Sequence, residues 1–390
     1  MDPLRHVKPA VREIAPYTLA AREARVKVNQ NENPWDLPET VKRRVLEKAL
    51  ARPWSRYPDF DPRELLEALS RFAGWRADGI LAGNGSNELI QALLMVTVGP
   101  GTRVVVPEPT FTLYAHLVRI LGGEPVRVRL VPGRPAPGED RVRPGPAGPG
   151  PAPDTPALAY DVSTLVAAGR EKGAAMTIVC SPNNPTGASL SLAEVERLCR
   201  DADGLVVVDE AYHEFAGGTV VPLLERHPNL VVLRTFSKAM ALAGLRVGYL
   251  LASPELVREI DKARLPYNLN FFSQLCARAA LEEKEALERT VSEIVAERER
   301  LLSRLADLPG VRAWPSRANF FLLELLGAQP RGVFEALHRR GVLVRDVTSY
   351  PTLSRCLRVS VGTPQENDAV LWALQTALGE AGMDLSTGRA

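Results

Sequence analysis

One lysine inside a run of small and apolar residues gives the first indication of chemistry. Lys238 follows Ser237 in the segment Thr235–Ala239, and Arg246 comes shortly after it. An apolar environment disfavours an unpaired ammonium, and desolvation lowers a lysine pKa, so the neutral amine can form a Schiff base with a carbonyl. Ser237 and Arg246 are donors that suit a phosphate. An aldehyde and a phosphate held together describe pyridoxal phosphate, although Lys238 alone also fits a surface lysine after a strand.

A second group of polar residues could hold the ring of such a cofactor. Asp209 ends the apolar run 205–208, and a carboxylate at the end of a strand can keep a pyridine nitrogen protonated so that the ring accepts electrons. Tyr212 and Asn184 can donate hydrogen bonds to the phenolic oxygen of the same ring. Taken singly, Asp209 also fits a helix cap and Asn184 a turn.

Two further loops carry clustered polar residues. Gly85, Ser86 and Asn87 lie in a glycine-rich turn before an apolar helical run to Val98, and the N–H groups of such a helix start can bind an anion. A helix start capped by Ser86 explains the same residues. The segment 29–35 is rich in asparagine and also fits an ordinary polar loop.

The elements that must position these residues alternate between strands and helices. Short, continuous apolar runs predict strands at 104–107, 126–131, 174–181, 205–209, 230–235 and 247–252, and helical spacing predicts helices at 39–51, 62–73, 110–121 and 192–199. Continuous runs are typical of strands buried on both faces of a mostly parallel sheet. Ligands bind beyond the carboxyl ends of such strands. The sequence therefore predicts an α/β fold with the candidate chemistry at one sheet edge.

The same pattern suggests how the chain is divided. Residues 1–28 predict an N-terminal arm, 29–271 a large domain, and 272–390 a smaller α+β domain introduced by a long helix over about 272–306. The segment 132–156 is dense in proline and glycine and predicts a flexible surface insertion without a catalytic role.

Composition narrows the function classes. The chain has 390 residues and a net charge of +2, and its dispersed Lys and Arg form no basic stripe, which argues against a nucleic-acid partner. No apolar run is long enough for a membrane span, and the N-terminus has no signal-peptide segment. The four cysteines are far apart and form no CxxC. They predict reduced thiols in a cytoplasmic protein, with neither a disulfide framework nor a metal site.

Taken together, the motifs resemble a known family. Four segments, 181–187, 209–212, 237–238 and 244–249, have the order and separation found in class I and II aminotransferases, which are pyridoxal-phosphate enzymes of fold type I. The resemblance covers nearly the whole chain outside 132–156. It implies a large domain with a mostly parallel seven-stranded sheet between helices and a smaller α+β domain.

The resemblance also implies a role for each matching residue. Lys238 would form the Schiff base and then transfer protons, with Asp209 at the ring nitrogen and Tyr212 and Asn184 at the ring oxygen. The phosphate would be held by Gly85, Ser86, Asn87, Ser237 and Arg246, and Phe111 would stack on the ring. Tyr57 would reach the cofactor of a neighbouring subunit, which implies a homodimer with shared active sites.

Within the family, the sequence is most similar to histidinol-phosphate aminotransferases. Six segments carry this similarity: 28–34, 56–59, 83–88, 266–270, 341–346 and 357–362. The implied reaction converts L-histidinol phosphate and 2-oxoglutarate to imidazole-acetol phosphate and L-glutamate, in histidine biosynthesis. The implied substrate-binding residues are Tyr17, Asn33, Arg345 and Arg358. Met240 and Asn87 depart from the usual pattern, the latter standing where aspartate is common.

Three other functions remain compatible with parts of the pattern. An aromatic or broad-range amino-acid aminotransferase would share the cofactor residues and differ in the substrate pocket. A threonine-phosphate decarboxylase would also bind a phosphorylated amino compound, but segment 266–270 favours histidinol phosphate. A sensor that joins this fold to a DNA-binding module is disfavoured, because the arm at 1–28 is too short for a helix-turn-helix domain.

Overall fold

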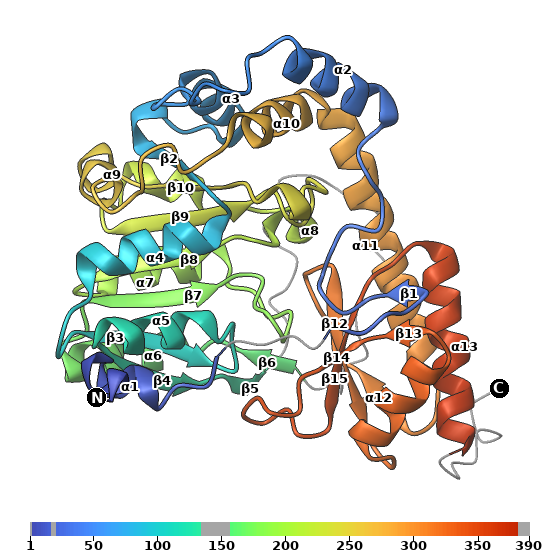
Figure 1. The fold of residues 1–390 in the computed structure, drawn as a ribbon. Helices are drawn as coiled ribbons and strands as arrows, with labels where there is room; N and C mark the ends of the chain where they lie inside the picture. Colours follow the sequence, from blue (N-terminus) through green and yellow to red (C-terminus); the bar gives the residue numbers. More distant parts are fainter. Residues whose placement is uncertain (1, 17–20, 134–156, 381–390) are drawn as a thin grey trace.

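The computed structural model describes residues 2–16, 21–133 and 157–380. It contains a large unit built on a central sheet and a smaller unit built on a second sheet, with the segment after α10 passing from one to the other (Figure 1).

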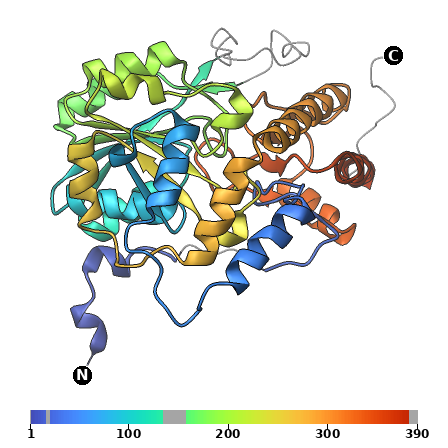
Figure 2. The ribbon, with the colours of Figure 1, turned by 90° about the horizontal axis from the view of Figure 1, so that it is seen from above.

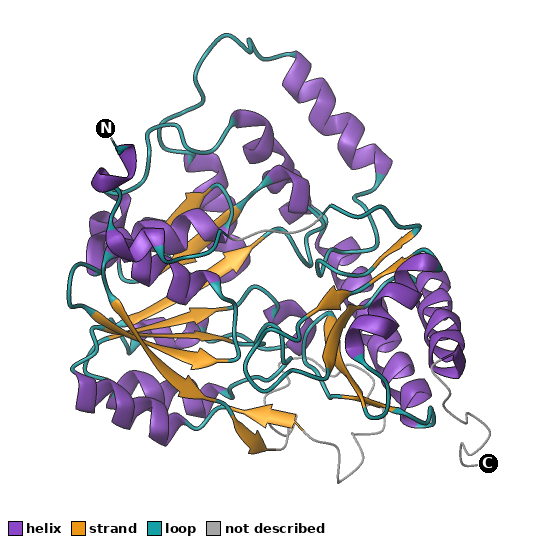
Figure 3. Cartoon of the chain, turned by 60° about the horizontal axis from the view of Figure 1, so that its bottom comes forward, coloured by secondary structure: helices purple, strands orange, loops and turns teal. Residues whose placement is uncertain are grey.

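The central sheet has seven strands in the order β2-β10-β9-β8-β7-β3-β4. Their bounds are β2 Ile80–Gly83, β10 Gly248–Leu251, β9 Leu230–Thr235, β8 Leu205–Asp209, β7 Met176–Cys180, β3 Arg103–Glu108 and β4 Glu124–Arg129. All neighbouring strands pair in parallel except β10, which is antiparallel to both β9 and β2. The predicted mostly parallel α/β sheet is thus confirmed, and Figure 3 shows its strands fanning out between the helices.

Helices cover both faces of this sheet. Alternate residues of β3 pack in two different cores. Val104 and Val106 pack in the core that holds α4 (Ser86–Thr97), α5 (Leu113–Leu121) and α9 (Pro254–Asp261). Val105 packs in the other core, with α6 (Val162–Lys172), α7 (Leu192–Asp201), α2 (Glu39–Leu50), α3 (Arg63–Ala73) and α10 (Phe271–Glu282). Burial on both faces explains why the strands are continuous apolar runs.

The smaller unit contains a second, antiparallel sheet in the order β11-β12-β15-β14. The strands are β11 Val311–Ala313, β12 Phe320–Leu325, β15 Cys356–Ser360 and β14 Arg345–Asp346, and the helices are α11 Lys284–Ala306, α12 Pro330–Arg339 and α13 Pro364–Glu380. Strand β1 (Val26–Lys27) pairs in parallel with β13 (Val342–Leu343). The N-terminal segment therefore joins the smaller unit before the chain enters the large one.

Short elements complete the described chain. They are α1 Pro9–Arg12, α8 His213–Ala216, the 3-10 helices Pro3–His6, Ala77–Gly79, Val221–Glu225 and Ala243–Leu245, and a ribbon of β5 Val131–Gly133 with β6 Ala157–Ala159. Within the described residues, none of the helices has the length and apolar character required to cross a membrane.

The structure departs from the sequence prediction in three places. Strand β2 was not expected. The predicted helix over 272–306 is two helices, because Glu283 leaves the helical conformation (φ −95°, ψ 44°). Arg44 of α2 pairs with Glu282 and Glu283 at this break, a tertiary contact that helical periodicity does not reveal. Of the predicted insertion, residues 132–133 belong to β5 and the rest lies outside the described residues; the domain boundaries stay predictions.

Candidate active site

The predicted lysine lies at the carboxyl edge of the parallel strands. The register aligns Cys180 with Asp209 and Asp209 with Leu233, so β7, β8 and β9 end together, and Lys238 follows β9. The Lys238 amine donates to the carbonyl of Gln30 at 2.9 Å. Burial lowers the pKa of Lys238 to about 7, with a further contribution from the positive charge of Arg358. A neutral, nucleophilic amine is therefore available near neutral pH.

Asp209 is held in a buried environment by two donors. Its Oδ2 accepts from the Tyr114 hydroxyl at 2.6 Å, and its Oδ1 accepts from the Ala211 amide at 3.0 Å. Burial raises the pKa of Asp209 to about 6, and the hydrogen bond from Tyr114 opposes that rise. The carboxylate is thus poised to take up a cationic partner such as a protonated ring nitrogen.

Tyr212 and Asn184 belong to the large unit, and each contacts a strand of the smaller unit. The Tyr212 ring packs edge-on against Phe320 of β12, with centroids 5.0 Å apart, and the Lys238 amine lies 5.9 Å from the Tyr212 ring centroid. Arg358 of β15 donates to Asn184 Oδ1 at 2.6 Å and to the Asn29 carbonyl at 2.7 Å. Burial raises the pKa of Tyr212, so its phenol stays protonated and able to donate.

The glycine-rich turn forms the open end of a helix beside Arg246. Gly85 has φ +77° and is the N-cap of α4, which has no side-chain cap. The alternative explanation of this turn, a helix capped by Ser86, is therefore wrong. The first N–H groups of a helix lack intrahelical acceptors. A Cβ on Gly85 would lie 2.7 Å from Arg246 Nη2, and Arg246 Nη1 donates to Ser237 Oγ at 3.2 Å. The predicted phosphate-binding residues therefore converge.

The loop that carries Phe111 is attached to the same edge. Asn183 is completely buried, accepts from Thr110 at 2.6 Å and donates to the Pro109 carbonyl at 2.9 Å. Phe111 packs edge-on against Tyr114, with centroids 5.6 Å apart. Because Tyr114 contacts Asp209, these contacts place the aromatic ring of Phe111 near the Asp209 carboxylate.

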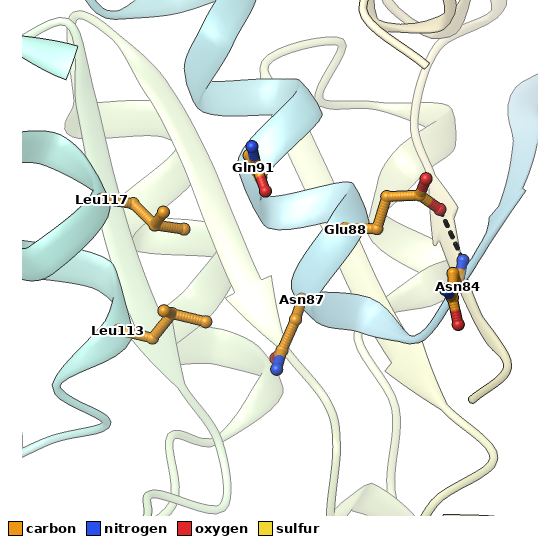
Figure 4. A pocket seen from close by; sticks show the side chains of 6 residues that line it. All are labelled: Asn84, Asn87, Glu88, Gln91, Leu113 and Leu117. Carbon is orange, nitrogen blue, oxygen red and sulfur yellow. Dashed lines mark hydrogen bonds between the residues drawn. The ribbon is translucent and has the colours of Figure 1, made fainter. Parts of the chain in front are cut away.

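Two hollows adjoin these residues. One of about 350 Å³ is lined by Asn33, Ser237, Gly244 and Ser360 among others, and Asn33 donates to the Ala239 carbonyl at 2.9 Å. The other, about 260 Å³, lies between α4 and α5, where Leu113 and Leu117 face Asn87 and Gln91 (Figure 4). In Figure 4 the Glu88 carboxylate accepts from the Asn84 backbone, which ties down the turn beside Gly85.

The predicted substrate residues, and Tyr57, which is predicted to reach the cofactor of a second subunit, are only partly assembled in one chain. Arg345 and Arg358 are direct partners in the antiparallel pair of β14 and β15, which places both side chains on one face. Tyr57 lies elsewhere: it is 76% exposed and stacks on Tyr267 at 4.5 Å. Tyr17 lies outside the described residues.

Two contacts of the site were missed by the sequence prediction. Tyr114, which bonds to Asp209, has the spacing of an ordinary core residue on a helix. Asn31 donates to the Tyr212 hydroxyl at 3.1 Å. Its only sequence signal was the asparagine-rich segment 29–35, from which Asn33 alone was selected.

The arrangement suits one class of protein. At a single sheet edge, a buried amine near its neutral state and a buried carboxylate meet phenol and amide groups and the uncapped start of a helix. They fit a phosphorylated aromatic aldehyde with a basic ring nitrogen. No cluster of three or more metal-binding side chains occurs in the parts of the chain that are described.

Comparison with known proteins agrees with that class. The family described as "Aminotransferase class I and II" matches residues 24–374. The histidinol-phosphate aminotransferase of Chlorobaculum tepidum is 37% identical over 371 residues, covering 95% of this chain and 99% of the relative. That of Chlorobium phaeobacteroides is 38% identical, covering 95% and 96%. The chain therefore belongs to the class I and II aminotransferase family.

Solved structures show the same fold at lower identity. The crystal structure of histidinol-phosphate aminotransferase from Sinorhizobium meliloti in complex with pyridoxal-5'-phosphate has a TM-score of 0.81 at 24% identity, covering 96% of this chain and 98% of that one. L-threonine-O-3-phosphate decarboxylase from Porphyromonas gingivalis has a TM-score of 0.73 at 21% identity, covering 91% and 99%. Because both reactions occur on this fold, the fold alone does not select between them.

Proposed function

We propose that the protein is a histidinol-phosphate aminotransferase that uses pyridoxal 5'-phosphate. The observation that carries the proposal is the pairing of Arg345 with Arg358 on neighbouring strands. Arg358 donates to Asn184 and to the Asn29 carbonyl, next to the Gln30 carbonyl that Lys238 contacts. Like charges directly opposite each other in a sheet are unfavourable. They are explained when an anionic group of the substrate lies between them.

The cofactor-binding residues provide complementary contacts to its separate groups. Asp209 would pair with the ring nitrogen, Tyr212 and Asn184 with the ring oxygen, and Phe111 with the ring face. The phosphate would bind the start of α4 at Gly85–Asn87 together with Ser237 and Arg246, where a helix N-terminus, a hydroxyl and a guanidinium all donate.

Lys238 would perform the proton transfers. When bound, the cofactor supplies an electron sink for the carbanion at the substrate Cα. The Lys238 amine has a pKa of about 7 because it is buried, so near neutral pH it can both accept a proton and return it. Asp209 keeps its negative charge at the ring nitrogen, and the phenol of Tyr212 holds its proton at the ring oxygen.

Substrate recognition would depend on the arginine pair. Arg358, which is 7% exposed, would bind the carboxylate of glutamate and share the phosphate of histidinol phosphate with Arg345. Asn33 and Tyr17 complete the proposed substrate set. A guanidinium pairs bidentately with either anion, so one site can serve both substrates.

The second subunit is also part of the proposal. Tyr57 stacks on Tyr267, and Phe60 packs edge-on against the same ring; all three side chains are exposed and form an apolar surface that a monomer would leave in water. The loop that carries Tyr57 projects away from the rest of the chain between α2 and α3 (Figure 2). In a homodimer this loop would reach the cofactor of the other subunit. A cytoplasmic location stays a prediction.

The test uses amino donors that differ in their anionic groups. With 2-oxoglutarate as acceptor, we expect histidinol phosphate to exceed phenylalanine and tyrosine in kcat/KM. Arg345→Gln should lower kcat/KM for histidinol phosphate by roughly 10- to 100-fold, the effect of one charged hydrogen bond, and leave phenylalanine nearly unchanged. Carbon dioxide release from threonine phosphate, or preference for phenylalanine in the unmodified protein, would refute this substrate assignment.

A further inference from the structure

Asn31 is placed between the second sheet and Tyr212. It is 1% exposed and has φ +54°, in the left-handed region that few side chains adopt. Its backbone N–H donates to Ser360 Oγ at 2.9 Å, and the backbone N–H of Ser360 donates to the Val28 carbonyl at 3.0 Å. Asn319 donates to the Asn31 carbonyl at 3.1 Å. Two hydrogen bonds from residues of the smaller unit therefore hold the Asn31 backbone, and the bond from Ser360 to Val28 holds the preceding residues to the same strand.

The hydrogen bonds determine which end of the Asn31 amide faces Tyr212. A hydroxyl has one hydrogen and accepts through its lone pairs. Ser360 Oγ already accepts from the Asn31 backbone, and it donates its hydrogen to Asn31 Oδ1 at 2.8 Å. The carbonyl end of the amide is thus taken by Ser360. The NH₂ end faces Tyr212, to which it donates at 3.1 Å, and the reversed amide would deprive the buried Ser360 hydroxyl of this acceptor for its hydrogen.

This direction keeps the Tyr212 hydrogen from being used by Asn31. An NH₂ group cannot accept, so the phenol cannot donate to Asn31. A buried hydroxyl retains a partner for its hydrogen in most proteins. We propose that Asn31 is a positioning residue that directs the Tyr212 hydroxyl to donate to the cofactor's ring oxygen, an inference that rests on the proposed function.

The proposal predicts the effect of exchanging an amide for a carboxylate. In Asn31→Asp, the new acceptor would take the Tyr212 hydrogen and withdraw it from the cofactor. We expect the pH midpoint of the bound cofactor's visible absorbance, measured without substrate, to rise by about one pH unit, the equivalent of one hydrogen bond. Asn31→Gly keeps the left-handed backbone, supplies no competing acceptor, and should shift the midpoint upward by a smaller amount.

A double-mutant cycle separates hydrogen-bond direction from plain charge. In the Tyr212→Phe background, Asn31→Asp should lose most of its effect on the midpoint. An equal shift in both backgrounds would mean that the carboxylate acts only through its charge, and it would overturn the proposal. If the Asp variant does not fold, the Gly variant decides: an unchanged midpoint also overturns it.

A measurement on the cofactor-free protein keeps this inference separate from the proposed function. The near-ultraviolet difference spectrum of Asn31→Asp minus the unmodified protein should show a tyrosine red shift, because a phenol that donates to a carboxylate absorbs at longer wavelength. That shift should vanish in the Tyr212→Phe background, and its absence would contradict the assigned direction. An unmodified protein that gains no visible absorbance with pyridoxal phosphate would instead refute the proposed function.

Discussion

Removing the hydroxyl of Tyr114 should make the stability of the cofactor-free protein more dependent on pH. The buried hydroxyl donates to Asp209 Oδ2 at 2.6 Å. A hydrogen bond to a charged group contributes about 1.5–3 kcal/mol, and one pKa unit corresponds to about 1.4 kcal/mol. Tyr114→Phe should therefore raise the pKa of Asp209 by about one to two units, from about 6.

The sign follows from proton linkage. The folded-state pKa of Asp209 lies above its ordinary value of 3.8, so between these values the folded state binds more protons than the unfolded state. Stability then falls as pH rises through this window. In Tyr114→Phe the pKa of Asp209 is higher, so this fall in stability continues to a higher pH. The substitution should therefore lower the free energy of unfolding by about 1.5–3 kcal/mol more at pH ~8.5 than at pH ~5.

The assay is thermal unfolding of the cofactor-free proteins at both pH values. The Asp209→Asn background provides the matched control, because the carboxyl that titrates is absent there. In that background the effect of Tyr114→Phe should be nearly independent of pH. A pH-independent effect in the native background, or a pH-dependent effect that survives Asp209→Asn, would refute the claim that Tyr114 acts through this carboxylate.

Three further substitutions test other parts of the structure. Gly85→Ala places a Cβ 2.7 Å from Arg246 Nη2 and should weaken the equilibrium binding of pyridoxal phosphate. The control is Gly217→Ala: Gly217 has a similar φ of +80°, but a Cβ there would have no atom within 4 Å, so the affinity should not change. In the unmodified protein Arg234 pairs with the buried Glu210 carboxylate at 2.9 Å, and Arg234→Met leaves that carboxylate buried without a cation. Thermal unfolding should show that the free energy of unfolding falls by about 3–5 kcal/mol and that adding Glu210→Gln partly restores it. Burial lowers the pKa of Lys238 from 10.5 to about 7. Between these pH values the unfolded state binds one more proton than the folded state, so the cofactor-free protein should gain stability as pH rises through this window. Lys238→Met should remove this gain, and an unchanged stability profile would contradict the lowered pKa.

The sequence predicted the sheet, and the positions of Asp209 and Lys238 at its carboxyl edge, for the same reason. A strand buried on both faces leaves a continuous apolar run, and each polar residue that follows such a run lies at its carboxyl end. Asp209 and Lys238 could be placed in this way because they are adjacent to β8 and β9. Strand β2 was missed because Ile80–Gly83 is short and ends in small residues next to a glycine-rich turn.

The remaining contacts depend on residues far apart in the chain. The Asn31 side chain bonds to residues 181 and 329 positions away, and no local pattern encodes such pairings. Tyr114 has the helical spacing of a core residue, and its hydroxyl acquires a role only when α5 packs beside β8. Periodicity reports which face of an element is buried, but it does not report which polar atom the neighbouring element presents.

The segment 29–31 connects β15 to Lys238 and Tyr212 through three successive contacts. The Asn29 carbonyl accepts from Arg358, the Gln30 carbonyl accepts from Lys238, and the Asn31 amide donates to the Tyr212 hydroxyl. Since Arg358 lowers the pKa of Lys238, the two cations repel each other across adjacent peptide units. An anion that neutralises Arg358 would relieve this repulsion and make Lys238 a stronger base, so under the proposed function substrate binding would promote proton transfer electrostatically.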